Sequence, residues 1–434
     1  MLELRSGYLI SGSTWSTGAF GVLPTLTMIG DGPRLFINTG LRRSAHYRPL
    51  NLHREKSIHA DPMTSVESLR ALVYARHGDP FQVLYAGTFH TTPHPAPGHL
   101  RIKILLSSVN PSDINIIEGV YPLRPALRSD LIPENSETPQ ESLYIAGAEA
   151  AGIITEIGEG IDAASSGLHV GDRVIMDELG LGCWSTHVDV EPEAVMKVPE
   201  GLSNVAGATI KVNPPTAWAM LREFVTLNPG DWVIQNGANS AVGKAVIQIA
   251  KSMGVKTINL VRNRDNIEEL KGQLAALGAD RVLTYDEILD KAMRKTVAEW
   301  TGGKDIQLGL NCVGGPETTA MAGYLGHDAH LVSYGAMSRS PLALPTSLFI
   351  FKYLTSHGYW QSRWYKTHSK ADREAMTNEI IQLYLDGKLK EPDHDIVELR
   401  GSDEEATRLF TEAAKRLAGG GTGKKVLLTW DVPS

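Results

Sequence analysis

The stretch 231–264 constrains the fold of this chain more than any other part of the sequence. It begins with a short apolar run at 232–235 and continues through a turn of small residues. Apolar side chains then recur at three- and four-residue steps over 242–253, and a second apolar run follows at 257–261. This pattern predicts a buried parallel strand, a tight turn, a helix with one apolar face and a second strand. Such a unit is typical of the doubly wound α/β domains that bind dinucleotides.

The turn and the first residues of the helix are the predicted pyrophosphate-binding segment, because helix N–H groups and the positive end of the helix dipole point there. The glycine pattern is a weak signal by itself, since Ala241 stands between Gly237 and Gly243. The strand, helix and second strand in register favour a cofactor site over an ordinary strand–turn–helix. The expected contacts are Asn239, Ser240, Ala241, Val242 and Gly243.

Two arginines after the second strand indicate which dinucleotide binds. A site that prefers NAD places Asp or Glu there, and the carboxylate binds the ribose 2′-hydroxyl. This chain has Arg262, Asn263 and Arg264 instead. Guanidinium groups attract a 2′-phosphate, so the sequence predicts NADPH as the cofactor. The alternative is that both arginines are solvated surface charges.

Size and composition exclude several other classes of protein. A length of 434 residues allows two domains and an extension. The net charge of −7 argues against a general nucleic-acid binder. The two cysteines lie far apart in the sequence, so they form neither a disulfide framework nor a cysteine zinc cluster. No apolar run approaches the roughly 20 residues of a membrane helix, so we expect no membrane insertion.

The spacing of apolar runs divides the folded part of the chain into three segments. Residues 68–205 carry short strands separated by Gly and Pro, which indicates a β-rich domain. Residues 206–362 alternate strands and helices, as a doubly wound parallel sheet does. Residues 363–434 are expected to return to the β-rich domain. The nucleotide-binding part should have strands at 231–235, 256–261, 281–285, 306–311 and 330–334, with helices at 242–253, 266–277 and 288–300.

Residues 1–67 form a different kind of segment. Five arginines and no acidic residue lie between positions 32 and 54, with Ser, Thr, Leu and aromatic residues between them. This composition is typical of a mitochondrial presequence, so we expect a disordered, presequence-like extension and a location in the mitochondrial matrix. A basic disordered tail without a targeting role is the alternative.

A β-rich domain, a nucleotide domain and a return to the first domain resemble the medium-chain dehydrogenase/reductase superfamily, whose first domain is GroES-like. Zinc-dependent members carry Gly-His-Glu where this chain has Gly147-Ala148-Glu149. The ligand histidine is absent and no cysteine lies nearby, so we expect no catalytic metal.

Within the zinc-independent branch, several segments resemble the mitochondrial trans-2-enoyl thioester reductases. The departures from that family are small and remove no charge or proton donor that the chemistry needs. They include Ala241, Asn263, Ala336 and Tyr359. The matching segments lie in order at 110–115, 119–122, 180–184, 212–217, 235–243, 261–264, 310–315, 334–337, 351–352 and 358–360.

This resemblance implies NADPH-dependent reduction of a trans-2-enoyl thioester, carried on coenzyme A or acyl carrier protein, in mitochondrial fatty acid synthesis. It also implies a homodimer. Tyr121, within Gly119-Val120-Tyr121-Pro122, is the implied catalytic residue, and a phenol with a pKa of about 10 is protonated at neutral pH. Whether it delivers the proton or positions the substrate stays open. The further implied cofactor contacts are Asn213, Tyr334, Gly335, Ala336, Met337, Tyr359, Trp360, Gln361 and Lys425.

Two other functions fit the same motifs. A quinone or small-enone reductase on this fold would share the cofactor residues but need not use Tyr121. A non-catalytic relative would bind NADPH as an accessory protein.

Overall fold

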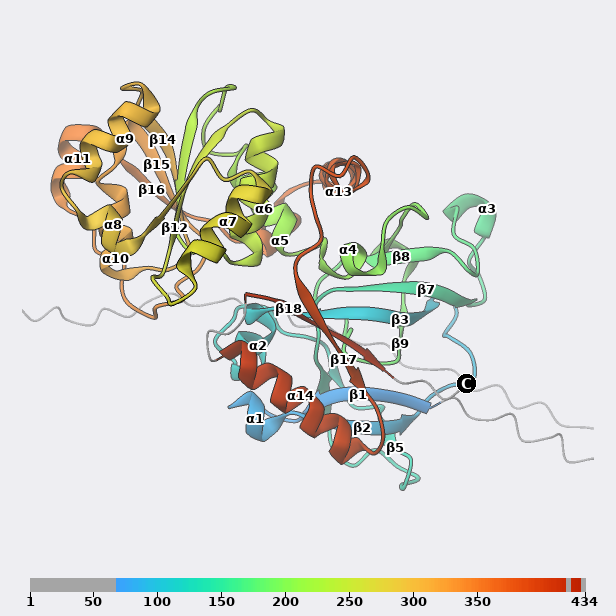
Figure 1. The fold of residues 1–434 in the computed structure, drawn as a ribbon. Helices are drawn as coiled ribbons and strands as arrows, with labels where there is room; N and C mark the ends of the chain where they lie inside the picture. The colour runs from blue at the N-terminus through green and yellow to red at the C-terminus, as the bar shows by residue number, and fades with distance from the viewer. Residues whose placement is uncertain (1–67, 419–422, 431–434) are drawn as a thin grey trace, which may run out of the picture. The chain divides into compact units, whose positions relative to one another are not determined.

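The structure, a computed structural model, describes residues 68–418 and 423–430 (Figure 1). All of them belong to one unit by their mutual contacts. The expected extension at 1–67 lies outside the described residues.

The nucleotide-binding part is built on a six-stranded parallel sheet in the order β13-β12-β11-β14-β15-β16. The chain enters at the centre, runs to one edge, and then crosses to build the other half. The order therefore reverses between β11 and β14, where a ligand crevice forms in such sheets. This confirms the doubly wound fold. The strands are β11 (Trp232–Gln235), β12 (Lys256–Val261), β13 (Arg281–Thr284), β14 (Ile306–Asn311), β15 (Leu325–Ser333) and β16 (Thr355–Gly358).

Two of the expected helices are present, as α6 (Ala241–Ser252) and α7 (Ile267–Leu277). The single helix expected at 288–300 is wrong: the structure has α8 (Tyr285–Leu289) and α9 (Met293–Thr301). Thr284 starts α8 through a capping box with Glu287, and the extended backbone of Asp290 ends it. The Asp290 carboxylate then accepts a hydrogen bond from the N–H of Ala292, which competes with helix continuation.

The remaining helices of this part lie before, between and after the strands. Periodicity did not predict α5, α10 or α11. They are α5 (Asn213–Met220), α10 (Gly315–Ala322), α11 (Thr346–Lys352), α12 (Gln361–Thr367) and α13 (Lys370–Leu385).

The β-rich part contains two sheets, ordered β4-β6-β1-β2-β5 and β10-β8-β7-β3-β18-β17, with β9 also paired to β3. Short helices connect the strands. The strands are β1 (Ser68–Tyr74), β2 (Tyr85–His90), β3 (Leu100–Val109), β4 (Leu127–Arg128), β5 (Ile132–Pro133), β6 (Leu143–Ile145), β7 (Ala150–Ile157), β8 (Arg173–Met176), β9 (His187–Val190) and β10 (Val195–Lys197). The helices are α1 (Pro80–Val83), α2 (Pro111–Glu118), α3 (Ala163–Ser166), η1 (Pro192–Ala194) and α4 (Asn204–Thr209).

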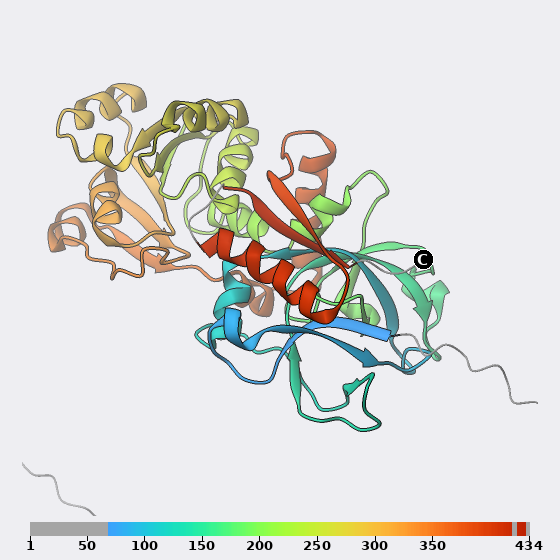
Figure 2. The same ribbon diagram turned by 60° about the horizontal axis from the view of Figure 1, so that its bottom comes forward.

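The C-terminal tail completes the β-rich part, as expected. Strand β18 (Lys425–Trp430) pairs antiparallel with β3, and β17 (His394–Leu399) pairs parallel with β18. Helix α14 (Asp403–Ala418), red in Figures 1 and 2, lies against β2 and β17. The tail reaches this sheet only after α12 and α13, whose Trp364 and Ile380 share a core with Val246 of α6. The domain boundaries drawn from the sequence stay a prediction.

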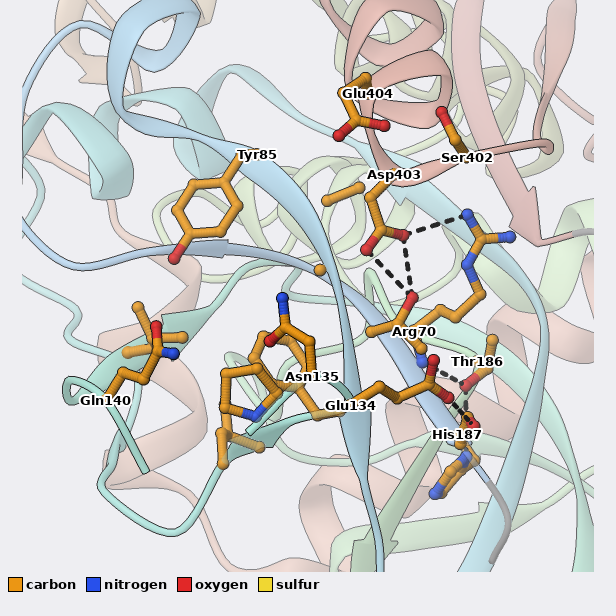
Figure 3. A pocket seen from close by; sticks show the side chains of 18 of the residues that line it. Arg70, Tyr85, Glu134, Asn135, Gln140, Thr186, His187, Ser402, Asp403 and Glu404 are labelled. Atoms are coloured by element: carbon orange, nitrogen blue, oxygen red, sulfur yellow. Dashed lines mark hydrogen bonds and ion pairs between the residues drawn. The ribbon is translucent and has the colours of Figure 1, made fainter. Parts of the chain in front are cut away.

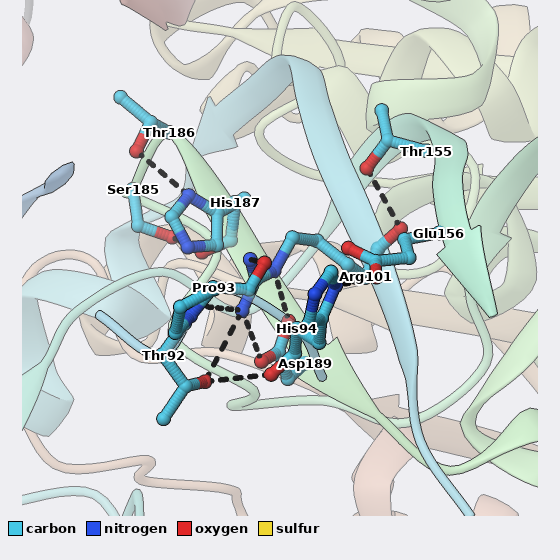
Figure 4. A network of polar contacts seen from close by, with 10 residues as sticks. All are labelled: Thr92, Pro93, His94, Arg101, Thr155, Glu156, Ser185, Thr186, His187 and Asp189. Atoms are coloured by element: carbon cyan, nitrogen blue, oxygen red, sulfur yellow. Dashed lines mark hydrogen bonds and ion pairs between the residues drawn. The ribbon is translucent and has the colours of Figure 1, made fainter. Parts of the chain in front are cut away.

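A buried arginine fixes the loop before β3 to the sheet (Figure 4). Arg101 on β3 is 2% exposed and makes two hydrogen bonds of 2.9 Å to the carboxylate of Asp189 on β9. It also donates to the carbonyl oxygens of Thr92 and Pro93. The planar guanidinium is thus satisfied on several sides, which a buried charge requires.

Candidate active site and cofactor crevice

The expected cofactor residues at 239–264 and 334–361 gather at one edge of the parallel sheet, whereas Asn213 and Lys425 lie elsewhere. Because the strands are parallel, their carboxyl ends all meet at that edge. The glycine turn follows β11, Arg262 follows β12, Tyr334 follows β15, and Tyr359 follows β16. The fold therefore brings together segments spread over 239–361.

The turn after β11 fits a pyrophosphate. Ser240 is the N-cap of α6, and its hydroxyl accepts a hydrogen bond of 3.1 Å from the N–H of Gly243. A Cβ atom at Gly243 would lie 2.7 Å from the carbonyl oxygens of Gly237 and Ala238, so only glycine allows this close packing. Gly237 has a φ of 58°, which favours glycine as well. Ala241 and Val242, half-buried, begin α6 directly beneath the turn, and Asn239 is half-buried before it.

The segment after β12 fits a 2′-phosphate. Arg262 and Asn263 are exposed and Arg264 is half-buried. The buried Nε of Arg264 has no hydrogen-bond partner among the described residues. Tyr285 is an addition that the sequence did not predict: its hydroxyl accepts a 3.1 Å hydrogen bond from the N–H of Gly237. Burial raises the pKa of Tyr285 to about 12, and the nearby charge of Arg262 opposes that rise.

The segment after β15 lies beside the glycine turn. Burial raises the pKa of Tyr334 well above its usual value, and both Cys312 and Ser240 are close enough to influence it. The N–H of Met337 donates to the carbonyl oxygen of Cys312 at 2.9 Å, which holds the loop against the end of β14. Gly335, Ala336 and Met337 are themselves exposed.

The predicted catalytic tyrosine meets a side chain from the nucleotide-binding part. Tyr121 follows α2 and Gly119, whose φ of 80° turns the chain. The Tyr121 hydroxyl accepts a 2.7 Å hydrogen bond from Nε1 of Trp360, a residue 239 positions away, and the rings meet edge to face. Burial raises the pKa of Tyr121, while the hydrogen bond from Trp360 opposes that rise. The hydroxyl therefore stays protonated at neutral pH, and its own proton remains available to a substrate oxygen.

Residues on either side of Trp360 are held by their own contacts. The Tyr359 hydroxyl donates to Oε1 of Gln361 at 2.6 Å, and the Tyr359 N–H donates to the carbonyl oxygen of Ser333 at 2.8 Å. The resemblance gave Trp360 only as a cofactor contact; its bond to Tyr121 is a finding of the structure.

Asn213 and Lys425 converge on Asn110, the N-cap of α2, which the sequence did not single out. Nδ2 of Asn213 donates to Oδ1 of Asn110 at 3.2 Å, and Nζ of Lys425 donates to the same oxygen. Lys425 is buried, so it is not a solvated surface charge. Burial lowers its pKa, and the charges of Glu149 and Asp113 oppose that shift.

A separate pocket lies elsewhere, on the β-rich part (Figure 3). It has a volume of about 1160 Å³, and none of the expected site residues lines it. Its acidic and basic groups are largely engaged with each other: Arg70 bonds Asp403 at 3.3 Å, and Asp403 accepts from Thr88 at 2.9 Å. Its size alone does not make it the active site.

Several further expectations can be placed. Trp184 is fully buried, donates to the carbonyl oxygen of Ser108 and packs on Phe410, so it belongs to the core. Cys183 and Cys312 are buried free thiols. Over residues 68–418 and 423–430, no three His, Cys, Asp or Glu side chains are grouped to hold a metal. Within the same ranges no helix has the length and apolar character needed to cross a bilayer.

The chain is similar to known proteins over most of its length. Residues 96–200 match the family model of the alcohol dehydrogenase GroES-like domain, and residues 241–377 match that of the zinc-binding dehydrogenases. The chain is 37% identical over 363 residues to the mitochondrial enoyl-[acyl-carrier-protein] reductase of Schizosaccharomyces pombe, covering 82% of this chain and 93% of that protein.

Solved structures of enoyl thioester reductases are similar too. The complex of Etr1p with NADP and crotonyl-CoA has a TM-score of 0.77 at 34% identity and covers 84% of this chain and 100% of that one. The Etr1p/Etr2p heterodimer from Candida tropicalis has a TM-score of 0.76 with the same identity and coverage. An NADPH:quinone reductase from Bacillus thuringiensis has a TM-score of 0.67 at 22% identity over 84% of this chain and 99% of that one, a likeness of fold alone.

Proposed function

Because this chain belongs to the family of mitochondrial enoyl-[acyl-carrier-protein] reductases, we propose that it reduces trans-2-enoyl thioesters to saturated acyl thioesters with NADPH. The resemblance inferred from the sequence motifs is confirmed. The observation that carries the site assignment is the hydrogen bond between Trp360 and the Tyr121 hydroxyl, next to the carboxyl edge of the cofactor sheet. One solved Etr1p structure is that of a double mutant in which one tyrosine and one tryptophan are substituted, the same two residue types as this pair.

The residues divide the work of the reaction between them. When bound, NADPH supplies the hydride that adds to the β-carbon of the enoyl group. Ser240 and the start of α6 hold the pyrophosphate, and Arg262 and Arg264 hold the 2′-phosphate. Negative charge develops on the thioester oxygen as the β-carbon is reduced. The Tyr121 O–H, oriented by Trp360, donates a hydrogen bond to that oxygen. The α-carbon of the enolate then takes up one proton, either from solvent water or from Tyr121, which solvent water then reprotonates.

Substitution of Tyr121 tests this assignment. Tyr121→Phe removes the donor but keeps the ring, so we expect kcat for trans-2-hexenoyl-CoA to fall about 100-fold or more while NADPH affinity is retained. Trp360→Phe removes the orienting N–H donor and part of the ring that meets Tyr121, and kcat should fall about tenfold. NADPH consumption is followed by absorbance, with NADH and a quinone as parallel substrates. Unchanged turnover in Tyr121→Phe contradicts the catalytic role, and activity with quinone alone contradicts the thioester specificity.

We also propose a homodimer and a mitochondrial matrix location. The Etr1p/Etr2p heterodimer supports a two-subunit assembly. Helix α11, which contacts β15 and precedes the edge strand β16 in the chain, exposes Ile350 and Phe351. The mitochondrial relatives together with the arginine-rich stretch 32–54 support targeting. The substrate carrier is coenzyme A or acyl carrier protein.

A further inference from the structure

A buried carboxylate that the mechanism does not use lies behind the cofactor contacts. Glu149, which directly precedes β7 in the chain, is fully buried. Its Oε1 accepts hydrogen bonds from the Ser108 hydroxyl at 2.6 Å and from Nδ2 of Asn110 at 2.8 Å. Its Oε2 accepts a 3.0 Å hydrogen bond from the N–H of Lys211. Three donors from two segments, 108–110 and Lys211, therefore meet this one carboxylate. Nδ2 of Asn110 also donates to the Ser108 hydroxyl at 3.1 Å.

These contacts decide which way the Asn110 amide faces. A carboxylate only accepts hydrogen bonds, so the group of Asn110 that faces Glu149 must be the donor, Nδ2. The amide oxygen then faces the other way, toward Nδ2 of Asn213 and Nζ of Lys425, which are both donors. The same rule orients Asn213: its Nδ2 donates to Asn110, so its Oδ1 is the amide atom that faces away from Asn110.

We propose that Glu149 is a positioning residue for the cofactor, acting through Asn110 to orient the amide of Asn213 and the ammonium group of Lys425. An outward Asn213 oxygen suits a ligand group that donates N–H, such as the carboxamide of a nicotinamide. This inference rests on the proposed contact between Asn213 and the cofactor. It assigns a role to a glutamate that occupies the Gly-Ala-Glu segment without a metal-ligating histidine beside it.

The hydrogen-bond pattern permits a reversal experiment. In Glu149→Gln, the new amide keeps its oxygen toward the N–H of Lys211, so its NH₂ group faces Asn110. The Asn110 amide must then turn its oxygen toward that NH₂ group. The NH₂ group of Asn110 comes to face Asn213 and Lys425, which are also donors. Asn110→Asp instead places a new carboxylate directly against the carboxylate of Glu149. In the double variant the new amide donates to the new carboxylate, whose other oxygen still accepts from Asn213 and Lys425. Charge and volume are conserved, and only the direction of one hydrogen bond is reversed.

We expect each single variant to lose about tenfold or more in kcat/KM for NADPH, and the double variant to recover most of it. The KM for crotonyl-CoA should change little, and the deuterium isotope effect with 4-deuterated NADPH should move in the single variants and return in the double variant. Glu156→Gln, a carboxylate on the outer part of β7, is the matched control and should resemble the parent. Circular dichroism and thermal melting check that all variants fold.

The outcomes separate the inference from the role on which it rests. If Asn213→Ala leaves NADPH binding and turnover unchanged, the proposed cofactor contact itself is wrong. If Asn213→Ala lowers kcat/KM for NADPH, the cofactor contact stands. If the folded double variant then loses as much kcat/KM as the two single variants lose together, the orienting role of Glu149 is wrong.

Discussion

At the scale of single residues, function depends on side chains whose donor and acceptor atoms are oriented by a hydrogen bond to one partner. Trp360 donates to Tyr121, so the proton of the tyrosine hydroxyl is not used in that hydrogen bond. For Arg262 and Arg264, in contrast, no ion pair is found within the part of the chain that the structure describes, and the buried Nε of Arg264 has no hydrogen-bond partner there. Their charges are therefore available to an anionic ligand.

The two arginines should decide the cofactor preference. In the variant with Arg262→Ala and Arg264→Ala, we expect kcat/KM for NADPH to fall by more than about 100-fold, because each charge-assisted contact to the 2′-phosphate contributes about 1.5–3 kcal/mol. The value for NADH should stay almost constant, since NADH lacks that phosphate. Arg400→Ala removes an exposed arginine elsewhere and is the control. Equal losses with both cofactors would mean that the arginines support the fold rather than the phosphate.

Asp113 gives the protein a specific pH dependence of stability. Burial raises its pKa to about 7, Glu149 adds to the rise, and the N–H of Asn110 and the charge of Lys425 oppose it. The unfolded carboxyl loses its proton near pH 4, whereas the folded one keeps it until about pH 7. The folded state therefore binds more protons in this window, and its stability falls as the pH rises from about 4 to 7.

Asp113→Asn should remove this dependence, because an amide oxygen can still accept the Asn110 N–H but does not titrate. We expect the variant to match the parent near pH 4 and to exceed it near pH 8 by up to about 4 kcal/mol in free energy of unfolding. Chemical denaturation at several pH values measures the difference, with the exposed Asp162→Asn as control. A parent and variant whose stabilities run parallel from pH 4 to 8 would show that Asp113 ionises normally.

At the scale of elements, helix caps determine where helices begin, and edge strands determine where a sheet can still pair with another element. Capping boxes at Thr284 and Ser369 start α8 and α13. At the start of α2, the Asp113 carboxylate accepts a 2.7 Å hydrogen bond from the N–H of Asn110. Strand β16 ends the parallel sheet, so one side of its backbone has no strand partner in the order of the described sheet. Edge strands of this kind are covered by another element or by another chain.

Helix α11 should contribute to the proposed dimer, because Ile350 and Phe351 are 57% and 69% exposed. We expect Ile350→Glu with Phe351→Glu to shift the protein from dimer to monomer in light scattering, because charged side chains oppose burial in an interface. Val170→Glu, which alters another exposed apolar residue on the β-rich part, should leave the mass unchanged. A parent protein that is already monomeric at micromolar concentration contradicts the proposal.

At the scale of the whole molecule, a cluster of buried charged side chains joins segments that are far apart in the sequence. Lys211 is fully buried between α4 and α5 and pairs at 2.8 Å with Asp177, which follows β8. Arg373 of α13 approaches the same carboxylate at 3.5 Å, and the Tyr365 hydroxyl donates to the Lys211 carbonyl oxygen at 2.8 Å. Removal of one partner would leave a buried charge uncompensated, so the cluster favours one arrangement of these segments.

Targeting also belongs to this scale, because it depends on a segment outside the described fold. Fusion of residues 1–67 to a fluorescent reporter should send the reporter to mitochondria, since arginine-rich segments without acidic residues are typical of presequences. A second fusion with Arg34, Arg42, Arg43, Arg48 and Arg54 replaced by Gln is the matched control and should stay in the cytosol. Diffuse signal from the unaltered fusion would contradict the targeting hypothesis.

The sequence by itself determined the elements whose signals are local. Strands β12 and β14 match the expected 256–261 and 306–311, because strands buried on both faces are continuous apolar runs. Helix α6 and its Ser240 cap were predictable for the same reason, since their signals lie within one turn of the chain. The break at Asp290 was missed because one side-chain hydrogen bond outweighed the apolar spacing.

Only the tertiary structure decided which functional groups meet. The bond between Tyr121 and Trp360 joins residues 239 positions apart, and that between Lys425 and Asn110 joins residues 315 apart. No period in the sequence records such pairs, because they form only when the sheets pack and buried polar groups must find partners. The motifs of the chain thus determined which chemistry is possible, and long-range packing decided how the polar atoms that perform it are oriented.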